Sequence, residues 1–555
     1  MMKNGNRDPT ATIQRKESPM PSPTSLDIWQ ALKRQAETMN QPDNHLSRLL
    51  ESRERNESCL LQYDGMSYDY VYQRVTPQIM AMLKSLAQEQ DICGRFKDMA
   101  DGKQVNNTEH RAALHMAARQ FSDQAVFVDG VDAMPEIRRV RDQIRGFSQD
   151  VHAGRIVGST GKPFRDVVII GIGGSYLGTE FVSTALQAYA KKGIRLHYLS
   201  NVDIHNFGEI AAIIDPEATL WVVVSKSYTT AETLANEMLA RQFMFQKGLD
   251  PAKHIVAVTS KGSPGDRPEN PMLATFHMFD FIGGRYSVTS AVGGVPLSLA
   301  LGYDIFERFL KGAESMDHHA LAADETANIP LTAALISIWN NNFLGYPAQA
   351  IIPYATPLRC LASHVQQLNM ESNGKMVTAN GQFLDIPTGM IQFGEPGTNA
   401  QHSFFQLAHQ GRPFPVEFIG ILEPQYAGLD VKTKGVTGHQ ELWANLLSQS
   451  MSLALGSRGN DVFRYFPGNR PSSLLVLKDL SPERVGGLLS FYEAKTIFEA
   501  FVWGINPFDQ FGVELGKTMA TGIREAMAQK NLDADHNFAD VDPISRHYLK
   551  QLYQS

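Results

Sequence analysis

Residues 166–178 read DVVIIGIGGSYLG, an apolar run that leads directly into a glycine-rich turn. The four consecutive β-branched residues Val167–Ile170 are typical of a strand buried on both faces of a parallel sheet. A glycine-rich turn that opens a helix presents backbone N–H groups to an anion. This stretch therefore predicts an α/β sheet with an anion site at the carboxyl end of the strand.

Short β-branched runs recur along the chain, separated by segments long enough for helices. This alternation is typical of parallel strands joined by helical crossovers. The runs fall into two series, so we expect two successive doubly wound α/β domains. The first series comprises 166–172, 196–200, 220–225 and 255–259, and the second comprises 350–353, 390–393, 416–422 and 473–477.

The two ends of the chain differ from this α/β pattern. Residues 1–24 are polar and rich in Pro and Ser, which predicts a flexible tail. Apolar residues then recur at helical spacing from Leu26, and helical periodicity extends over 107–114. The expected organisation is a tail (1–24), a mainly helical region (25–150), two α/β domains (151–305 and 306–505) and a C-terminal helical arm (506–555).

Composition limits the class of protein. The chain has 555 residues, of which 43% are hydrophobic and 20% charged, and its net charge is −7. These proportions are those of a globular protein of two or more domains, and the charge gives no support to a nucleic-acid or membrane partner. Three scattered cysteines, no secretory signal and no run of about 18 apolar residues predict a cytoplasmic protein.

Two glycine loops superficially match nucleotide-binding motifs. A dinucleotide-binding G-x-G-x-x-G turn requires glycine where this chain has Tyr176. The segment 512–518, GVELGKT, has one residue too few between its glycines for a Walker A loop, and it follows no strand. Neither dinucleotide nor ATP chemistry is therefore expected.

A second anion site is predicted where the apolar run 220–224 ends. The following segment, Ser225–Thr233, carries five serine and threonine hydroxyls and opens a helix at the sheet edge where ligands bind. A single hydroxyl here would be explained as an ordinary helix N-cap. Five hydroxyls, with Ser175 on the neighbouring loop, favour a site for a monophosphate.

Four further segments combine tight turns with reactive side chains: 283–287 (GGRYS), 370–375 (MESNGK), 394–402 (GEPGTNAQH) and 508–517 (FDQFGVELGK). Each taken alone has an ordinary structural explanation. In order and spacing, these segments and the two anion-site loops closely resemble the glucose-6-phosphate isomerase (phosphoglucose isomerase) family, from about residue 105 to residue 520.

The resemblance implies a doubly wound sugar-isomerase (SIS) fold that occurs twice, in a homodimer that interconverts glucose 6-phosphate and fructose 6-phosphate without a cofactor or metal. Glu371 resembles the family's base and His402 its ring-opening residue, which the partner subunit would contribute. Arg285 and Lys517 match charge-stabilising positions. The implied substrate-binding residues are Gly174, Ser175, Ser225, Lys226, Ser227, Thr230, Thr233, Gly284, Gln367 and Gln510.

The implied chemistry needs these residue types. A carboxylate such as Glu371 can take a proton from one carbon and return it to the next across a planar enediol. A guanidinium such as Arg285 stays protonated and stabilises the anionic intermediate. Cyclic hexose phosphates must first open, and His402, with Lys517, can exchange the protons that this step needs.

The sequence departs from the family pattern at three places. Tyr176 stands where the family commonly has aspartate, the phosphate loop reads Ser-Lys-Ser-Tyr at 225–228, and residues 355–360 are atypical. Two other functions stay open: an isomerase that prefers mannose 6-phosphate, and a sugar-phosphate sensor without catalysis. A sensor would have no need for four reactive side chains in these motifs.

Overall fold

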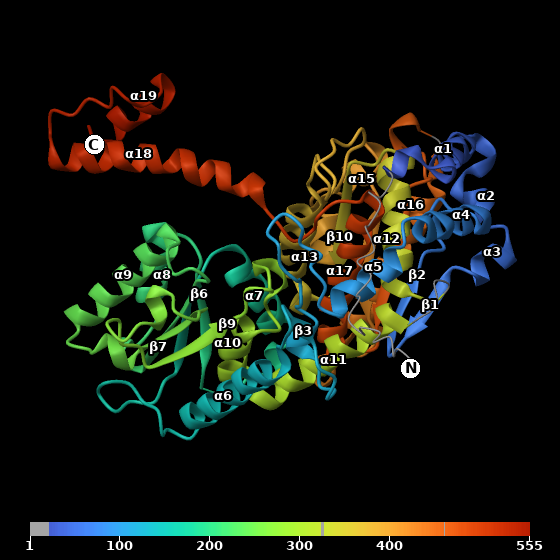
Figure 1. Ribbon diagram of the computed structural model, residues 1–555. Coiled ribbons are helices and arrows are strands. Elements are labelled where there is room, and N and C mark those ends of the chain that lie inside the picture. Colours follow the sequence, from blue (N-terminus) through green and yellow to red (C-terminus); the bar gives the residue numbers. More distant parts are fainter. Residues whose placement is uncertain (1–21, 192, 323–326, 460, 555) are drawn as a thin grey trace, which may run out of the picture. The chain divides into compact units, whose positions relative to one another are not determined.

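The computed structural model describes residues 22–191, 193–322, 327–459 and 461–554 (Figure 1). The chain divides into two compact units, one that ends at Pro507 and one that comprises Phe508–Ser555. The expected N-terminal tail lies outside the described residues except for its last three, and a short 3-10 helix, η1, covers Pro23–Ser25.

The first sheet has five parallel strands in the order β6-β5-β7-β8-β9. Relative to the sequence this is the order 2-1-3-4-5, which reverses between β5 and β7 and so creates a crevice at their carboxyl ends. Four strands were predicted from the sequence, and the fifth, β9, was missed. The bounds are β5 Asp166–Ile170, β6 Arg195–Leu199, β7 Thr219–Val224, β8 Ile255–Ser260 and β9 Ala274–Met278.

Helices cover both faces of the first sheet, which explains why its strands are apolar throughout. Helices α8 (Ile204–Ala211) and α9 (Ala231–Gln246) pack on one face, where Trp221 and Val223 enter a core with Ala240 and Met244. Helices α6 (Met134–His152) and α10 (Ala291–Leu301) lie on the other side of the sheet (Figure 1).

The second sheet has six strands in the order β1-β2-β17-β12-β10-β11. Its four parallel strands, β10, β11, β12 and β17, again follow the order 2-1-3-4. The α/β fold with two sheets, in which parallel strands follow the doubly wound order, is thus confirmed. The bounds are β1 Leu60–Tyr63, β2 Met66–Asp69, β10 Ala348–Pro353, β11 Ile391–Phe393, β12 Val416–Ile421 and β17 Ser472–Leu477.

Long helices between the sheets form the centre of the first unit. Helix α17 (Pro482–Trp503) is buried along almost its whole length and packs on α11 (Tyr303–Ala322). Six further helices of the first unit are α7 Leu177–Ala185, α12 Ile329–Ile338, α13 Leu361–Val365, α14 Gly397–Gln401, α15 Phe405–Gln410 and α16 Gly438–Leu455.

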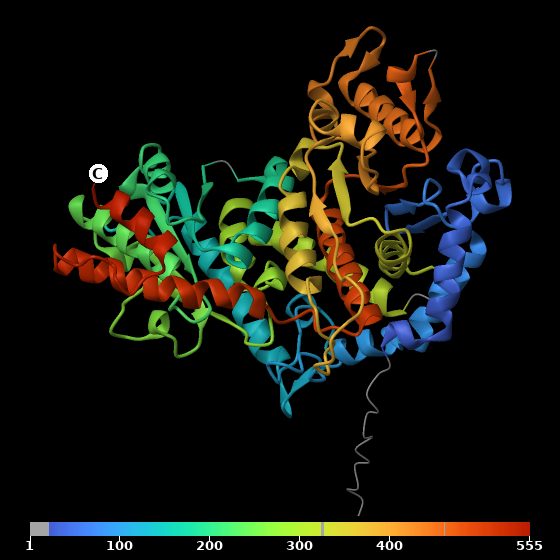
Figure 2. The same ribbon diagram turned by 90° about the horizontal axis from the view of Figure 1, so that it is seen from above.

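The N-terminal region contains helices but also contributes two strands to the second sheet, because β2 pairs antiparallel with β17. Its helices lie beside the part of the first unit that contains the second sheet (Figure 2). They are α1 Asp27–Met39, α2 Leu46–Leu49, α3 Arg53–Glu57, α4 Pro77–Glu89 and α5 Ile92–Ala100.

The helical prediction for 107–114 is wrong. Backbone bonds between Asn106 and Arg111, of 3.1 and 3.2 Å, close a turn there, and His110 has a φ of 54°. Asn and Thr in this segment favour turns through local side-chain hydrogen bonds, and that preference outweighs the apolar spacing.

The C-terminal unit is helical. Helix α18 (Glu514–Leu532) follows the short helix η15 (Phe511–Val513), and α19 (Pro543–Leu552) folds back on α18 through Ala526 and Leu549, with Phe538 between them. Within the described ranges, no helix combines the length and the apolar character that a membrane span requires.

Candidate active site

Three loops lie around the predicted anion site at the carboxyl edge of the first sheet. The turn η4 (Gly173–Ser175) follows β5, the segment 225–230 follows β7, and η9 (Gly284–Tyr286) follows β9. The order of the strands reverses between β5 and β7, and ligands of open α/β sheets bind at such a reversal. The predicted anion-binding residues therefore lie where this fold supports a ligand.

Gly174 allows two of these loops to touch. A Cβ atom at Gly174 would collide with the carbonyl group of Gly284 and would lie 2.7 Å from the backbone nitrogen of Arg285. The Ser287 hydroxyl donates to the Gly284 carbonyl oxygen at 2.6 Å and lies 3.3 Å from that of Gly174. Only glycine leaves room for this approach, which sets the loop of Arg285 against the glycine turn.

The hydroxyls of the second loop differ in what they bind within the chain. Ser225 is buried and its oxygen accepts from the Tyr228 backbone N–H at 3.1 Å. The Ser227 and Thr229 hydroxyls lie 2.7 Å apart. Thr230 is the N-cap of α9, yet its side chain makes no capping hydrogen bond. The ordinary-cap explanation therefore does not account for Thr230, whose hydroxyl is left for another acceptor or donor.

The conformation of Tyr228 and the position of Thr233 also shape this loop. Tyr228 has a φ of 54°, in the left-handed region, and this turns the chain between the strand and the helix. Thr233 lies in the first turn of α9 and is buried. Free N–H groups in the first turn of a helix attract a negatively charged group.

Lys226 brings positive charge to the same edge. Its ammonium donates to the Asp280 carbonyl oxygen at 2.9 Å. Burial lowers the pKa of Lys226, and the nearby charge of Arg111 lowers it further. The Asp280 carboxylate, 3.7 Å from the ammonium, acts in the opposite direction, and a negatively charged ligand beside Lys226 would likewise favour its charged form.

Glu371 and Arg285, the predicted base and the predicted stabilising cation, form an ion pair. The Arg285 Nη1 atom donates to Glu371 Oε1 at 3.1 Å, and their side chains are 1% and 19% exposed, respectively. A largely enclosed carboxylate can accept a proton from carbon, and a fixed guanidinium beside it can stabilise the resulting oxyanion.

Glu371 ends an unusual helical segment. Helix α13 continues into a π-helix, η12 (Gln366–Glu371), and π-turns occur frequently at functional sites. Gln367 lies on this π-helix beside the glycine turn, with Nε2 3.1 Å from the position of a Cβ atom at Gly173. The π-helix thus brings Gln367 and Glu371 to the loops of the first sheet.

Two site residues were not predicted from the sequence. The Ser372 hydroxyl accepts from Arg285 Nε at 2.7 Å and lies 2.9 Å from the Tyr286 hydroxyl. Arg285 Nη2 also donates to the Pro507 carbonyl oxygen at 2.6 Å. Ser372 and Tyr286 belong to two of the motifs that carry the family resemblance. The sequence itself does not indicate that their hydroxyls hold the guanidinium.

The structure does not join His402 to Glu371 by any hydrogen bond among the described residues. His402 directly follows α14 and is exposed. Gln510 and Lys517 belong to the second unit, where Gln510 precedes η15 and Lys517 is exposed on the first turn of α18. The site described within the first unit therefore contains the predicted residues other than His402, Gln510 and Lys517.

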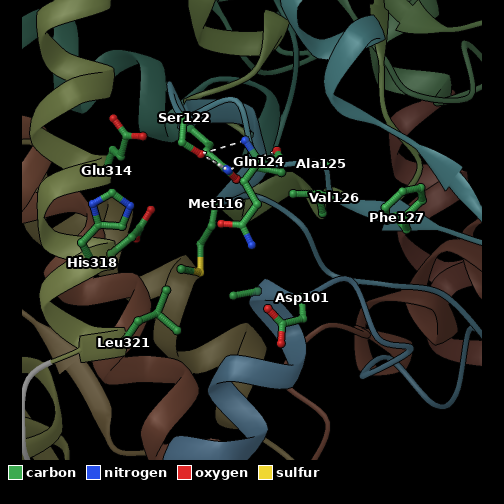
Figure 3. A pocket seen from close by; sticks show the side chains of 14 residues that line it. Asp101, Met116, Ser122, Gln124, Ala125, Val126, Phe127, Glu314, His318 and Leu321 are labelled. Atoms are coloured by element: carbon green, nitrogen blue, oxygen red, sulfur yellow. Dashed lines mark hydrogen bonds between the residues drawn. The ribbon is translucent and has the colours of Figure 1, made fainter.

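A separate cavity of about 250 Å³ opens between α11 and the segment around 116–127 (Figure 3). Its walls include Glu314 and Asp317, and no residue predicted for the active site lines it. The Asp317 carboxylate accepts two hydrogen bonds from Arg119, at 2.6 and 2.7 Å. Over the ranges that the structure covers, no group of three His, Cys, Asp or Glu side chains is arranged to hold a metal.

Sequence comparisons relate most of this chain to one family of proteins. The sequence model of the family described as phosphoglucose isomerase matches residues 69–541. A glucose-6-phosphate isomerase from Desulfosudis oleivorans is 62% identical over 533 residues, which cover 95% of this chain and 98% of the relative. A cytosolic glucose-6-phosphate isomerase from Arabidopsis thaliana is 42% identical over 92% of this chain and 94% of its own.

A solved structure is similar over the whole fold. The crystal structure of a glucose-6-phosphate isomerase from Chlamydia trachomatis superimposes with a TM-score of 0.88 and is 40% identical. The match covers 96% of this chain and 99% of that one. Together with the family match, this similarity shows that the chain belongs to the phosphoglucose isomerase family.

Proposed function

We propose that this chain interconverts D-glucose 6-phosphate and D-fructose 6-phosphate, in glycolysis and gluconeogenesis, by proton transfer through an enediol intermediate. Membership of the family and the activity named for its relatives support the reaction. The observation that carries the mechanism is the contact of 3.1 Å between Arg285 Nη1 and Glu371 Oε1. Relatives named as cytosolic support a cytoplasmic location.

Glu371 is the base in this proposal. Its carboxylate takes the proton from C2 of the aldose or C1 of the ketose and returns it to the neighbouring carbon. The side chain is partly enclosed, so the proton it holds exchanges slowly with water during one turnover. The chemistry requires a single carboxylate that reaches both carbons on one face of the enediol.

Arg285 stabilises the intermediate. Its guanidinium is held by Ser372 and by the Pro507 carbonyl, and it faces Glu371 with its remaining edge. A cation fixed before the reaction stabilises developing charge without reorganisation. When Glu371 takes up the proton, the guanidinium loses its anionic partner and the enediol oxygen replaces it.

The phosphate group binds at the carboxyl edge of the first sheet. Gly174, Ser175, Ser225, Lys226, Ser227, Thr230 and Thr233 form this pocket in the proposal, with Gly284, Gln367 and Gln510 contacting the sugar. The uncapped hydroxyl of Thr230 and the charge of Lys226 support it. Energy from binding the phosphate, which does not react, orients the sugar against Glu371.

Ring opening uses His402 of the partner subunit in a homodimer, together with Lys517. The exposed position of His402 supports this assignment. Large apolar side chains that a monomer would leave in water support the dimer: Leu429 is 80% exposed, Val431 71%, and Val462 and Phe463 83% each. Association of subunits would remove such side chains from water.

The activity is tested with purified protein on fructose 6-phosphate in a coupled assay for glucose 6-phosphate. We expect turnover with and without a chelator, because no step in the proposed mechanism needs a metal. A parallel assay with mannose 6-phosphate separates the proposed substrate from its epimer. Absence of turnover on either hexose phosphate would refute the proposal and favour a sensor.

The shared site is tested by mixing two inactive homodimers, Glu371→Gln and His402→Ala. After dissociation and random reassembly, about half of the dimers are mixed, and each mixed dimer has one site free of both substitutions. About a quarter of all sites should regain full activity. If both residues came from one chain, no activity would return despite confirmed exchange of subunits.

A further inference from the structure

Helix α17 carries an ion pair inside the protein that the proposed mechanism does not use. Lys495 Nζ lies 2.7 Å from Glu499 Oε1, and the side chains are 5% and 1% exposed. A buried pair of charges costs free energy unless further hydrogen bonds satisfy it. The bonds that satisfy Glu499 therefore indicate why the pair is there.

The second oxygen of Glu499 binds the segment that carries Glu371. Asn369 Nδ2 donates to Glu499 Oε2 at 2.7 Å, and Asn373 Nδ2 donates to the same oxygen at 2.9 Å. Both amides are 2% exposed or less. The two asparagines stand two residues before and two residues after Glu371, so one carboxylate oxygen holds the chain on both sides of it.

This segment needs such an anchor. Asn369 lies in the π-helix η12, and Asn373 lies in the short helical continuation after it, just before the helix ends. A π-turn is rare because its hydrogen-bond geometry is less favourable than that of an α-helix. Hydrogen bonds to an ionised carboxylate are stronger than those between neutral groups, and two of them can fix a turn that the backbone alone would not hold.

We infer that Glu499 is a positioning residue, which fixes the π-turn of Glu371 through Asn369 and Asn373 while Lys495 neutralises its charge. The inference rests on the proposed role of Glu371 as the base. A base that is misplaced by about 1 Å can lose about 100-fold in rate, although its own chemistry is unchanged. Loss of the anchor should therefore lower kcat and leave binding of the phosphate group intact.

The test compares two double variants that differ in a single feature. Lys495→Met with Glu499→Gln keeps an oxygen that can accept from the asparagines, whereas Lys495→Met with Glu499→Leu does not. Both variants lack the buried charges. We expect the Gln variant to keep kcat within about threefold of the wild type and the Leu variant to lose about 30-fold.

Binding measurements separate positioning from general damage. KM for fructose 6-phosphate and inhibition by inorganic phosphate should stay within about twofold in both variants, because the phosphate loop belongs to the first sheet. Equal kcat in two folded double variants would overturn the inference, as would a rise in KM with kcat unchanged.

Further variants keep the test decisive if the Leu variant does not fold. Asn369→Leu removes one of the two amides and should lower kcat about tenfold with KM unchanged. Tyr492→Phe is the matched control, because it deletes another buried hydrogen bond of α17, to Glu417, and should lower stability without lowering kcat. A loss of kcat in Tyr492→Phe equal to that in Asn369→Leu would overturn the inference. Activity retained in Glu371→Gln would refute the proposed role of Glu371 as the base, on which the inference rests.

Discussion

The two sheets share the strand order 2-1-3-4 but supply different parts of the candidate site. In the first sheet, the residues predicted for the phosphate pocket lie in the segments that follow β5 and β7, at the carboxyl edge where the fold places ligands. In the second sheet, Glu371 ends the helical crossover between β10 and β11 and follows no strand directly. The shared topology therefore locates the proposed anion site, whereas a local π-turn and its buried partners locate the proposed base.

The largest expected effect comes from a substitution that removes the proposed base and leaves the phosphate site unchanged. Glu371→Gln should lower kcat about 10⁴-fold, because the amide cannot accept a proton from carbon, while fructose 6-phosphate still binds. A coupled assay gives kcat, and titration calorimetry gives the affinity. Turnover near the wild-type rate would show that another group is the base.

The contact between loops of the first sheet should come next in magnitude. Gly174→Ala places a Cβ against the backbone of Gly284 and Arg285 and forces the loops apart. We expect kcat/KM to fall about 100-fold, measured by the same assay. Gly208→Ala is the control, because a Cβ there meets no atom within 4 Å. Equal activity of the two variants would show that the close approach is unimportant.

A smaller effect is expected when the phosphate site alone is weakened. Ser225→Ala combined with Thr230→Ala should weaken binding of substrate and of inorganic phosphate together by about 30-fold, since two hydrogen bonds to an anion are lost. Competition between phosphate and fructose 6-phosphate measures both affinities. If neither affinity changes, the hydroxyls are not part of a phosphate site.

The smallest effect concerns stability. Thr230 caps α9 without a side-chain hydrogen bond, so Thr230→Ala should change the free energy of unfolding by less than about 0.5 kcal/mol. Thr76 caps α4 and accepts from the Ile79 N–H, so Thr76→Ala should cost about 1 kcal/mol. Urea denaturation of both variants provides the comparison. Equal losses would mean that Thr230 is an ordinary cap.

The sequence predicted the eight strands whose apolar runs are long and bounded by turns. It missed β9, whose residues are half-buried and polar in part, and it missed β1 and β2, because their place in the sheet depends on pairing with β17 far along the chain. The helix predicted over 107–114 failed because turn-forming side chains outweighed apolar spacing. Such errors come from long-range pairing and local competition, which periodicity does not record.

The candidate site divides in the same way. Residues of Gly-rich and hydroxyl-rich loops could be predicted, because their types alone indicate anion binding. Ser372 and Glu499 could not, because each acts through a partner distant in sequence. Lys495 and Glu499, like Glu493, are charged residues of a largely buried helix, and their spacing of four residues is the sequence signal for an ion pair.

The central claim is that Glu371 carries the proton between the carbons, and exchange with heavy water tests it most directly. The wild-type protein is incubated with fructose 6-phosphate in D2O for many turnovers, and deuterium at C1 and C2 is followed by NMR. The account predicts that deuterium accumulates at these carbons in proportion to enzyme, and that Glu371→Gln incorporates none. Wild-type isomerisation without any deuterium on carbon would indicate a direct hydride shift and would contradict the account.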